Sequence, residues 1–232
     1  MKKAVVCQDL KKSYGSGETS VKALRGISFT SEVGELLMLV GPSGCGKTTL
    51  LSIISSILDQ DSGQCLIFGK NLNAMKNDKR TEYRGKHIGF IFQQFNLIPS
   101  LTALENTAIP LIINGENKEQ AFALAAELLD CVGLKNRMYA FPREMSGGEQ
   151  QRVAICRGCI HSPEVIVCDE PTSALDHATG MRVMELFREI ALTKESSLII
   201  VTHDSRILHF ADKILEMEDG KIISQSTNGL AK

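Results

Sequence analysis

The chain has 232 residues, of which 43% are hydrophobic and 23% are charged, and its formal net charge is −1. A chain of this length can bury one substantial core, or one core with a small subdomain. The near-zero charge gives no electrostatic support for a nucleic-acid partner, so we expect none. No apolar run approaches the roughly 18 residues that a membrane span needs, and no secretion signal is visible. We therefore expect a soluble, cytoplasmic chain that another subunit would have to hold at a membrane.

The first third of the chain predicts short strands separated by turns. The strands are expected at Ala4–Cys7, Gly26–Phe29 and Leu36–Val40, with turns at Gly15–Gly17 and Val33–Glu35. Directly after the last of these strands, the sequence changes from an apolar run to a glycine-rich segment.

That segment, Gly41–Thr48, reads GPSGCGKT and fits the pattern G-x-x-x-x-G-K-T of a phosphate-binding P-loop. Its glycines allow backbone N–H groups to point at phosphate oxygens, and Lys47 adds a positive charge. The hydroxyl of Thr48 can ligate Mg²⁺. The run Thr49–Ile54 can form a helix whose N-terminus faces the same anion. The alternative interpretation is a glycine-rich turn that binds nothing.

The middle of the chain contains two strands and then a helical region. Gln64–Phe68 and His87–Phe92 predict strands, and the polar segment Asn71–Arg84 is a candidate helix. From Leu101 to Met138 the pattern is helical, with a break at Gly115–Asn117. Within it, one helix is expected to end near Cys131–Gly133, and four residues at helical spacing predict its buried face: Ala121, Leu124, Ala125 and Leu128.

The last third of the chain alternates strands and helices again. Val165–Cys168 and Leu198–Val201 predict fully apolar strands, and Met181–Leu192 predicts an amphipathic helix between them. Such alternation indicates a parallel sheet that is covered on both faces. Two further strands are expected to form a hairpin, Lys213–Met217 and Lys221–Ser224, and the tail Gln225–Lys232 is expected to be loose.

Polar groups follow the ends of these apolar strands, where ligands of parallel sheets bind. Asp169 and Glu170 follow one strand in the Walker B arrangement, and His203 follows another. An aspartate there can help to hold Mg²⁺, and the adjacent glutamate can orient or activate an attacking water. The alternative interpretation is a solvated acidic strand end.

The seven cysteines are an odd number and lack a secretion signal, which favours free thiols in a reducing compartment. Cys156 and Cys159 form a C-x-x-C pattern, but no second ligand pair lies at a suitable spacing. We interpret them as small core residues on one helix face.

The segment Phe141–Ile155, which reads FPREMSGGEQQRVAI, resembles the signature region of the ATP-binding-cassette (ABC) ATPases. The usual signature is LSGGQ, so this chain departs from it at Met145 and Glu149. The Ser-Gly-Gly triplet is intact, and these groups would open a helix with an anion-binding N-terminus. The resemblance implies that this signature serves the ATP of a partner subunit, in a head-to-tail homodimer.

The resemblance covers about Val5 to Ser224 and implies an ATPase that uses ATP and Mg²⁺. It implies catalytic roles for Lys47, Gln93, Glu170 and His203. It implies nucleotide contacts from Tyr14, Gly41, Pro42, Ser43, Gly44, Cys45, Gly46, Lys47, Thr48, Thr49, Ser146, Gly147, Gly148, Glu149 and Asp176. It implies metal contacts from Thr48, Gln93 and Asp169. For Tyr14, which would stack on adenine, the alternative is an ordinary surface tyrosine.

The resemblance implies an α/β P-loop NTPase fold of the ABC ATPase type. This fold would have a RecA-like mixed sheet, an N-terminal antiparallel β subdomain and an inserted α-helical signature subdomain. We expect a single domain over residues 1–232, with the nucleotide-binding core at about 1–95 and 160–232 and the helical subdomain at about 96–159.

Two further regions narrow the resemblance. Gln93–Asn106 is similar to the lipoprotein-releasing (LolD) and macrolide-export (MacB) ATPases, and Thr202–Leu208 with Met217–Gly220 is similar to the glycolipid-export (DevA) type. These likenesses imply a subunit that powers export or extraction of a lipid, lipoprotein or drug-like substrate through a separate permease. It would lie peripherally at the cytoplasmic face of the inner membrane, and a periplasmic adaptor is a further candidate partner.

A small apolar cluster follows Gln93 and consists of Phe95, Leu97, Ile98 and Leu101. We interpret it as a groove for a coupling helix of the permease. Simple packing between subdomains is the alternative.

Other functions share some of these motifs. A regulatory cassette of the cell-division type would have the same motifs without transport. DNA-repair and chromosome-structuring ATPases carry a long coiled coil or a zinc insert between P-loop and signature, and no heptad run lies between Thr48 and Ser146. A small-molecule kinase would explain the P-loop but not the signature, and a binding module without catalysis would not need every catalytic position to be filled.

Overall fold

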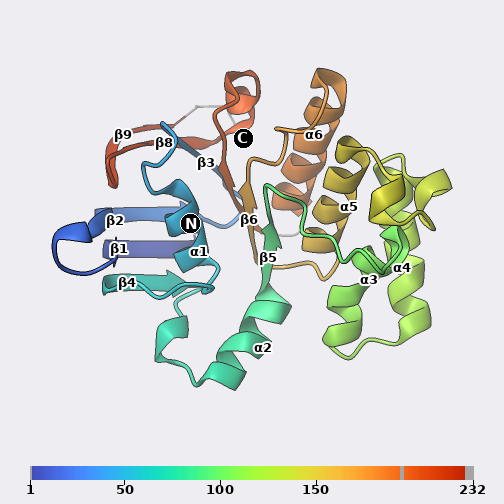
Figure 1. Cartoon of the computed structure of the whole chain (residues 1–232), viewed down its shortest axis with the longest axis horizontal. Helices are drawn as coiled ribbons and strands as arrows, with labels where there is room; N and C mark the ends of the chain where they lie inside the picture. Colours follow the sequence, from blue (N-terminus) through green and yellow to red (C-terminus); the bar gives the residue numbers. More distant parts are fainter. Residues whose placement is uncertain (1, 194–195, 228–232) are drawn as a thin grey trace.

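The computed structural model describes residues 2–193 and 196–227, whose strands form two sheets with helices around them (Figure 1). The strands are β1 (Lys3–Tyr14), β2 (Val21–Glu32), β3 (Leu36–Val40), β4 (Ser62–Ile67), β5 (Ile88–Ile91), β6 (Val165–Asp169), β7 (Ser197–Val201), β8 (Lys213–Glu218) and β9 (Lys221–Thr227). The α-helices are α1 (Lys47–Ile54), α2 (Asn77–His87), α3 (Ala103–Ile113), α4 (Lys118–Cys131), α5 (Gly147–Cys159) and α6 (His177–Thr193). The short 3-10 helices are η1 (Gly17–Thr19), η2 (Leu72–Ala74), η3 (Lys135–Arg137), η4 (Pro142–Glu144) and η5 (Ser205–Phe210).

The smaller sheet has the antiparallel order β2-β1-β4, and the larger has the order β5-β6-β7-β3-β8-β9. The larger sheet is parallel except for its last strand, which pairs antiparallel with β8. The expected mixed sheet with an N-terminal antiparallel β subdomain is therefore confirmed. β1 and β2 are longer than the predicted strands because their pairing continues from Lys3 opposite Glu32 to Tyr14 opposite Val21, through polar residues that give no apolar signal.

Helices cover both faces of the larger sheet (Figure 1). On one face, α1 lies between the two sheets and buries Leu50, Leu51 and Ile54 completely. On the other face, α6 buries Met184 and Phe187 in a second cluster with residues of β3, β6 and β7. Because β3, β6 and β7 are apolar and buried on both faces, packing holds these strands in a fixed register. The candidate site lies at their carboxyl ends.

A third apolar cluster lies among α3, α4 and α5. The predicted buried face of α4 is wrong at Leu124, whose surface is 49% exposed. The helix packs on its neighbours along a narrower stripe in which Ala121, Ala125 and Leu129 are fully buried. Two small residues in this stripe allow close approach to α3, and they leave the larger leucine outside.

Three other predictions need adjustment. The polar segment Asn71–Arg84 contains η2 and most of α2, which continues to His87, so this histidine ends a helix instead of beginning a strand. The predicted helix Met181–Leu192 begins earlier, at His177. The tail is ordered in β9 as far as Thr227, because these residues pair with β8, and the rest of it lies outside the described residues. Within the described part of the chain, no helix is long and apolar enough to cross a bilayer.

Candidate functional site

A cavity of about 570 Å³ lies where the carboxyl ends of β3, β6 and β7 meet the smaller sheet. It collects most of the residues that the sequence predicts for nucleotide chemistry. Those that line it are Tyr14, Ser43, Gly44, Gly46, Lys47, Thr48, Thr49, Gln93, Asp169, Glu170 and His203. The other P-loop residues, Gly41, Pro42 and Cys45, belong to the same loop but do not line the cavity.

Two glycines of the P-loop are required by the close approach of other strands. Gly41 has φ +147°, and a Cβ there would lie 2.1 Å from the carbonyl oxygen of Met217. Gly46 has φ +104°, and its Cβ would lie 2.4 Å from the carbonyl oxygen of Ala23. No side chain fits at either position, because the backbone of the loop packs directly against β2 and against the β8–β9 hairpin.

Lys47 supplies a positive charge that no carboxylate neutralises within the loop. Its Nζ donates to the carbonyl oxygens of Gly41, at 2.7 Å, and Pro42, at 2.8 Å, and the residue is 9% exposed. Both partners are neutral carbonyl oxygens, so neither of them compensates a positive charge on Lys47. The N-terminus of α1 begins at the same residue and adds the positive end of the helix dipole.

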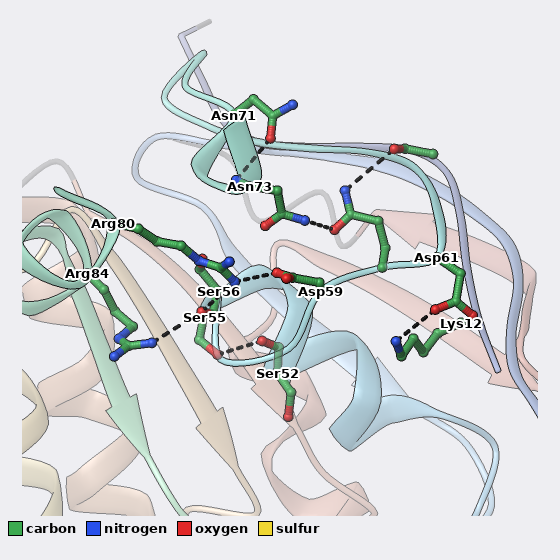
Figure 2. A network of polar contacts seen from close by, with 12 residues as sticks. Lys12, Ser52, Ser55, Ser56, Asp59, Asp61, Asn71, Asn73, Arg80 and Arg84 are labelled. Carbon is green, nitrogen blue, oxygen red and sulfur yellow. Dashed lines mark hydrogen bonds and ion pairs between the residues drawn. The ribbon is translucent and has the colours of Figure 1, made fainter. Parts of the chain in front are cut away.

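The far end of α1 is held by two arginines of α2 (Figure 2). Ser56 follows the helix with φ +57°, a left-handed conformation that is uncommon outside glycine. Arg80 donates from Nε to the hydroxyl of Ser56, at 2.5 Å, and from Nη2 to its carbonyl oxygen, at 3.0 Å. Arg84 donates to the same carbonyl oxygen, at 3.2 Å. Two guanidinium groups at the negative end of the helix stabilise α1, whose other end follows the P-loop.

Thr48 and Asp169 offer oxygen ligands side by side. The hydroxyl of Thr48 donates to Oδ2 of Asp169, at 3.0 Å. Burial raises the pKa of Asp169, and the bond from Thr48 and the charge of Lys47 offset part of this effect. A hydroxyl and a carboxylate beside a phosphate site are the hard oxygen donors that Mg²⁺ takes, so these two residues fit that ion.

Glu170 and His203 meet at the cavity wall. Oε1 of Glu170 lies 2.7 Å from Nδ1 of His203, and the two side chains are 10% and 72% exposed. Glu170 has φ +54°, which for a non-glycine residue costs on the order of 1 kcal/mol, and its N–H donates to the carbonyl oxygen of Val201, at 2.9 Å. This backbone conformation, held by the neighbouring strand, places the carboxylate at the cavity.

Six further cavity residues come from β2 and from the β8–β9 turn, and no sequence motif connects them with a nucleotide. They are Val21, Lys22, Ala23, Arg25, Asp219 and Gly220. The β8–β9 turn is tied to both neighbours, because the N–H of Gly220 donates to Cys45 and its carbonyl oxygen accepts from Arg25. At the same edge, the hydroxyl of Tyr14 lies 3.3 Å from that of Thr49.

The signature residues lie elsewhere on the chain. Ser146 precedes α5, and its hydroxyl accepts a hydrogen bond from the N–H of Glu149, at 3.3 Å. None of the residues 146–149 lines the cavity of its own chain. Asp176 is likewise outside it, and its carboxylate caps α6 by accepting from the N–H and the hydroxyl of Thr179.

A second hollow of about 530 Å³, here called the α2–α3 groove, lies beside β5. Its apolar lining consists of Ile57, Ile88, Phe90, Phe92, Ile109, Pro110 and Ile113. None of Phe95, Leu97, Ile98 and Leu101, which the sequence suggested as a groove, lines it. Leu97 instead packs against the cluster of α3, α4 and α5.

The α2–α3 groove is nevertheless connected to that segment by Arg157, which also lines it. Arg157 donates to the carbonyl oxygens of Phe95 and Asn96, each at 2.6 Å.

On the same helix as Arg157, Cys156 and Cys159 are buried, and burial raises the pKa of the Cys156 thiol well above its usual range. A buried, protonated thiol suits core packing better than metal or redox chemistry.

Comparisons with known proteins show the family of this chain. The ABC transporter family matches residues 24–173. The lipoprotein-releasing system ATP-binding protein LolD of Bacteroides fragilis is 41% identical over 93% of this chain and 98% of its own length. The macrolide export ATP-binding/permease protein MacB of Mannheimia succiniciproducens is 40% identical over 94% of this chain, which spans 34% of that longer protein.

Among solved structures, the ATP-binding cassette MJ0796, in a dimeric post-hydrolysis state bound to ADP and Pi, superposes with a TM-score of 0.92 at 36% identity. The match covers 96% of this chain and 98% of that one. The signature, the P-loop and the fold therefore have one explanation: this chain belongs to the ABC transporter family, as an ATP-binding subunit and an ATPase.

Proposed function

We propose that two copies of the chain close head-to-tail on two ATP molecules, each bound between the P-loop of one copy and the signature of the other. The position of Ser146 is the observation that carries this proposal, because the residue opens an anion-binding helix and yet lies outside its own chain's cavity. A helix N-terminus of this kind would complete the site of a second copy. The related cassette MJ0796 is dimeric with ADP and Pi, which supports the same arrangement.

Within each composite site, different residues of the chain would bind the phosphates, hold Mg²⁺ and orient the attacking water. Lys47 and the P-loop amides hold the phosphates. Thr48 and Asp169 would hold Mg²⁺, which supplies charge neutralisation to the phosphates when bound. Glu170 orients the attacking water and accepts its proton. His203, already 2.7 Å from that carboxylate, fixes its direction, and Gln93 lines the same cavity.

The same proposal includes a membrane partner. The apolar α2–α3 groove, with Ile113 75% exposed and Ile57 49% exposed, would receive a short helix of a permease. Arg157 would connect that helix to the segment after Gln93. By analogy with LolD and MacB, the permease would export or extract a lipid, lipoprotein or drug-like substrate, and the chain would lie peripherally at the cytoplasmic face of the membrane. The chain would act as one domain, with core segments 1–95 and 160–232 and a helical subdomain at 96–159.

The substitution Glu170→Gln tests the catalytic part of this proposal. It removes the proton acceptor but keeps the size of the side chain, so hydrolysis should fall by at least about 100-fold. ATP binding should persist, and ATP should now hold the dimer together. Steady-state phosphate release, equilibrium ATP binding and light scattering measure the three quantities.

Glu116→Gln is the matched control, since Glu116 is exposed in the loop between α3 and α4. It should leave all three measurements unchanged. Turnover by Glu170→Gln within a fewfold of the parent would contradict the assigned role.

A further inference from the structure

The signature of this chain carries a charge that the usual LSGGQ sequence lacks. Glu149 occupies the place of the glutamine, in the first turn of α5. Its Oε2 accepts from the N–H of Ser146, at 2.7 Å, and its own N–H donates back to the hydroxyl of Ser146. The carboxylate thus lies within hydrogen-bonding distance of the residue that opens the helix.

This carboxylate is ionised. The hydrogen bond from the backbone of Ser146 lowers the pKa of Glu149, and Arg137 lowers it further. A negative charge in the first turn stabilises the isolated helix. The same charge opposes a second anion at that N-terminus, and this is where the proposed dimer would place a phosphate of the partner's ATP.

Arg137 forms an ion pair with the carboxylate of Glu149. It lies in η3, and its Nε is 3.1 Å from Oε1 of Glu149, while the two side chains are 40% and 22% exposed. Its Nη2 also donates to the carbonyl oxygen of Glu144, in the turn that leads into the signature. One guanidinium therefore bridges the segment before the signature and the first turn of α5. Sequence reasoning missed it because nothing in the motif points ten or more residues upstream to a cation.

We propose that Arg137 is a positioning residue that neutralises Glu149, and so allows the N-terminus of α5 to accept the phosphate of the partner's ATP. The inference rests on the head-to-tail dimer proposed above. Arg137 acts on the dimer and not on the chain's own cavity, from which it is absent. ATP binding by a single chain should therefore be independent of it.

The experiment measures the ATP concentration that gives half-maximal dimerisation, by light scattering, with every variant made in the Glu170→Gln background to prevent hydrolysis. Arg137→Gln should raise this concentration by roughly tenfold at low salt, because an uncompensated carboxylate then faces the phosphate. Arg137→Lys keeps the charge and should lie between the two. The deficit should shrink at about 0.5 M salt, where the Debye length is about 4 Å and exposed charges farther apart than this are largely screened.

The decisive variant is the double substitution Arg137→Gln with Glu149→Gln. Removing both charges should restore dimerisation to within about twofold of Glu149→Gln alone. A structural role for Arg137 predicts instead a loss that Glu149→Gln does not repair and that salt does not change, and this result would overturn the inference. Thermal unfolding followed by circular dichroism shows whether each variant is folded.

The two proposals fail in different ways. If the Glu170→Gln parent stays monomeric with ATP, the composite site is wrong and the role of Arg137 falls with it. If the parent dimerises and Arg137→Gln dimerises equally well, the composite site stands and only the role of Arg137 is refuted.

Discussion

We propose that two helix N-termini of this chain bind anions, and the two differ in how much of the protein surrounds them. The N-terminus of α1 lies in a cavity with Lys47, Thr48 and Asp169, and it is anchored at its far end by two arginines of α2. The N-terminus of α5 is exposed, and Glu149 in its first turn carries a negative charge balanced by Arg137. Figure 1 shows the first helix enclosed between the sheets and the second toward the helical region. In the proposed dimer, a helix N-terminus would therefore bind phosphate with many neighbouring groups in one place and with few in the other.

The enclosed site should depend on Lys47 without help from any other chain. Lys47→Met removes the ammonium and keeps most of the side-chain volume, and we expect ATP binding to weaken by about 10- to 100-fold, the range for losing a charged hydrogen bond to an anion. Fluorescence titration with a labelled nucleotide measures the change on the isolated chain. Binding within twofold of the parent would mean that the P-loop amides and the helix dipole suffice.

The exposed site should behave in the opposite way, with effects on dimerisation only. Ser146→Asp keeps an oxygen that caps α5, because aspartate caps a helix as well as serine does, but it adds a negative charge where the partner's phosphate would lie. In the Glu170→Gln background we expect ATP-driven dimerisation to weaken by at least about tenfold, while thermal stability and ATP binding per chain stay the same.

Ser146→Ala is the matched comparison, since it loses the cap and adds no charge. It should cost about 1 kcal/mol of stability and affect dimerisation less than Ser146→Asp does. If the two variants weaken dimerisation equally, the hydroxyl itself and not the charge at this helix end controls the contact.

The sequence was most informative where one short segment determines its own conformation. β3 was predicted with the correct bounds because an apolar run that ends at a glycine leaves little choice. The P-loop, Asp169, Glu170 and His203 could be placed together because parallel strands end at one edge. By contrast, no local sequence pattern indicated which distant segments pair with one another.

The residues that were missed all depend on those distant pairings. Lys22 and Gly220 reach the cavity only because β2 and the β8–β9 hairpin meet there, and Arg137 reaches Glu149 only because η3 folds back on α5. The error at Leu124 has a related cause: the spacing of the apolar residues fitted a helix face, but packing against α3 selected the smaller alanines. Periodicity identifies a face, whereas the neighbouring helix decides which part of it is buried.

Tyr14 tests how far the enclosed site extends onto the smaller sheet. If its ring stacks on adenine, Tyr14→Ala should weaken ATP binding by several-fold to about tenfold, and Tyr14→Phe should bind within about twofold of the parent. Competition between ATP and GTP adds a second measurement, because stacking tolerates either base. An equal loss in both variants would assign the effect to the hydroxyl that lies 3.3 Å from Thr49.

The smallest effect concerns the stability of the enclosed site. Burial raises the pKa of Asp169 above its ordinary value of 3.8, so the folded chain binds this proton more tightly than the unfolded chain does. The resulting stability is fully present below pH 3.8 and is lost as the pH rises through the raised pKa of the folded state. At neutral pH the ionised carboxylate therefore destabilises the fold. Asp169→Asn keeps an acceptor for Thr48 and should raise the free energy of unfolding by at most about 1 kcal/mol, after allowance for solvent screening, while it abolishes hydrolysis.

Thermal unfolding at a series of pH values measures this gain, with Glu116→Gln as an exposed control. The difference between Asp169→Asn and the parent should be largest near neutral pH and should shrink as the pH falls toward the ordinary aspartate pKa. A variant that is less stable than the parent at neutral pH would mean that the hydrogen bond from Thr48 and the charge of Lys47 stabilise Asp169 by more than its burial costs. The comparison between the two helix ends would then change. At the N-terminus of α1, the buried carboxylate of Asp169 would not reduce the stability of the fold. Of the two ends, only that of α5 would carry a charge, on Glu149, that needs a compensating partner.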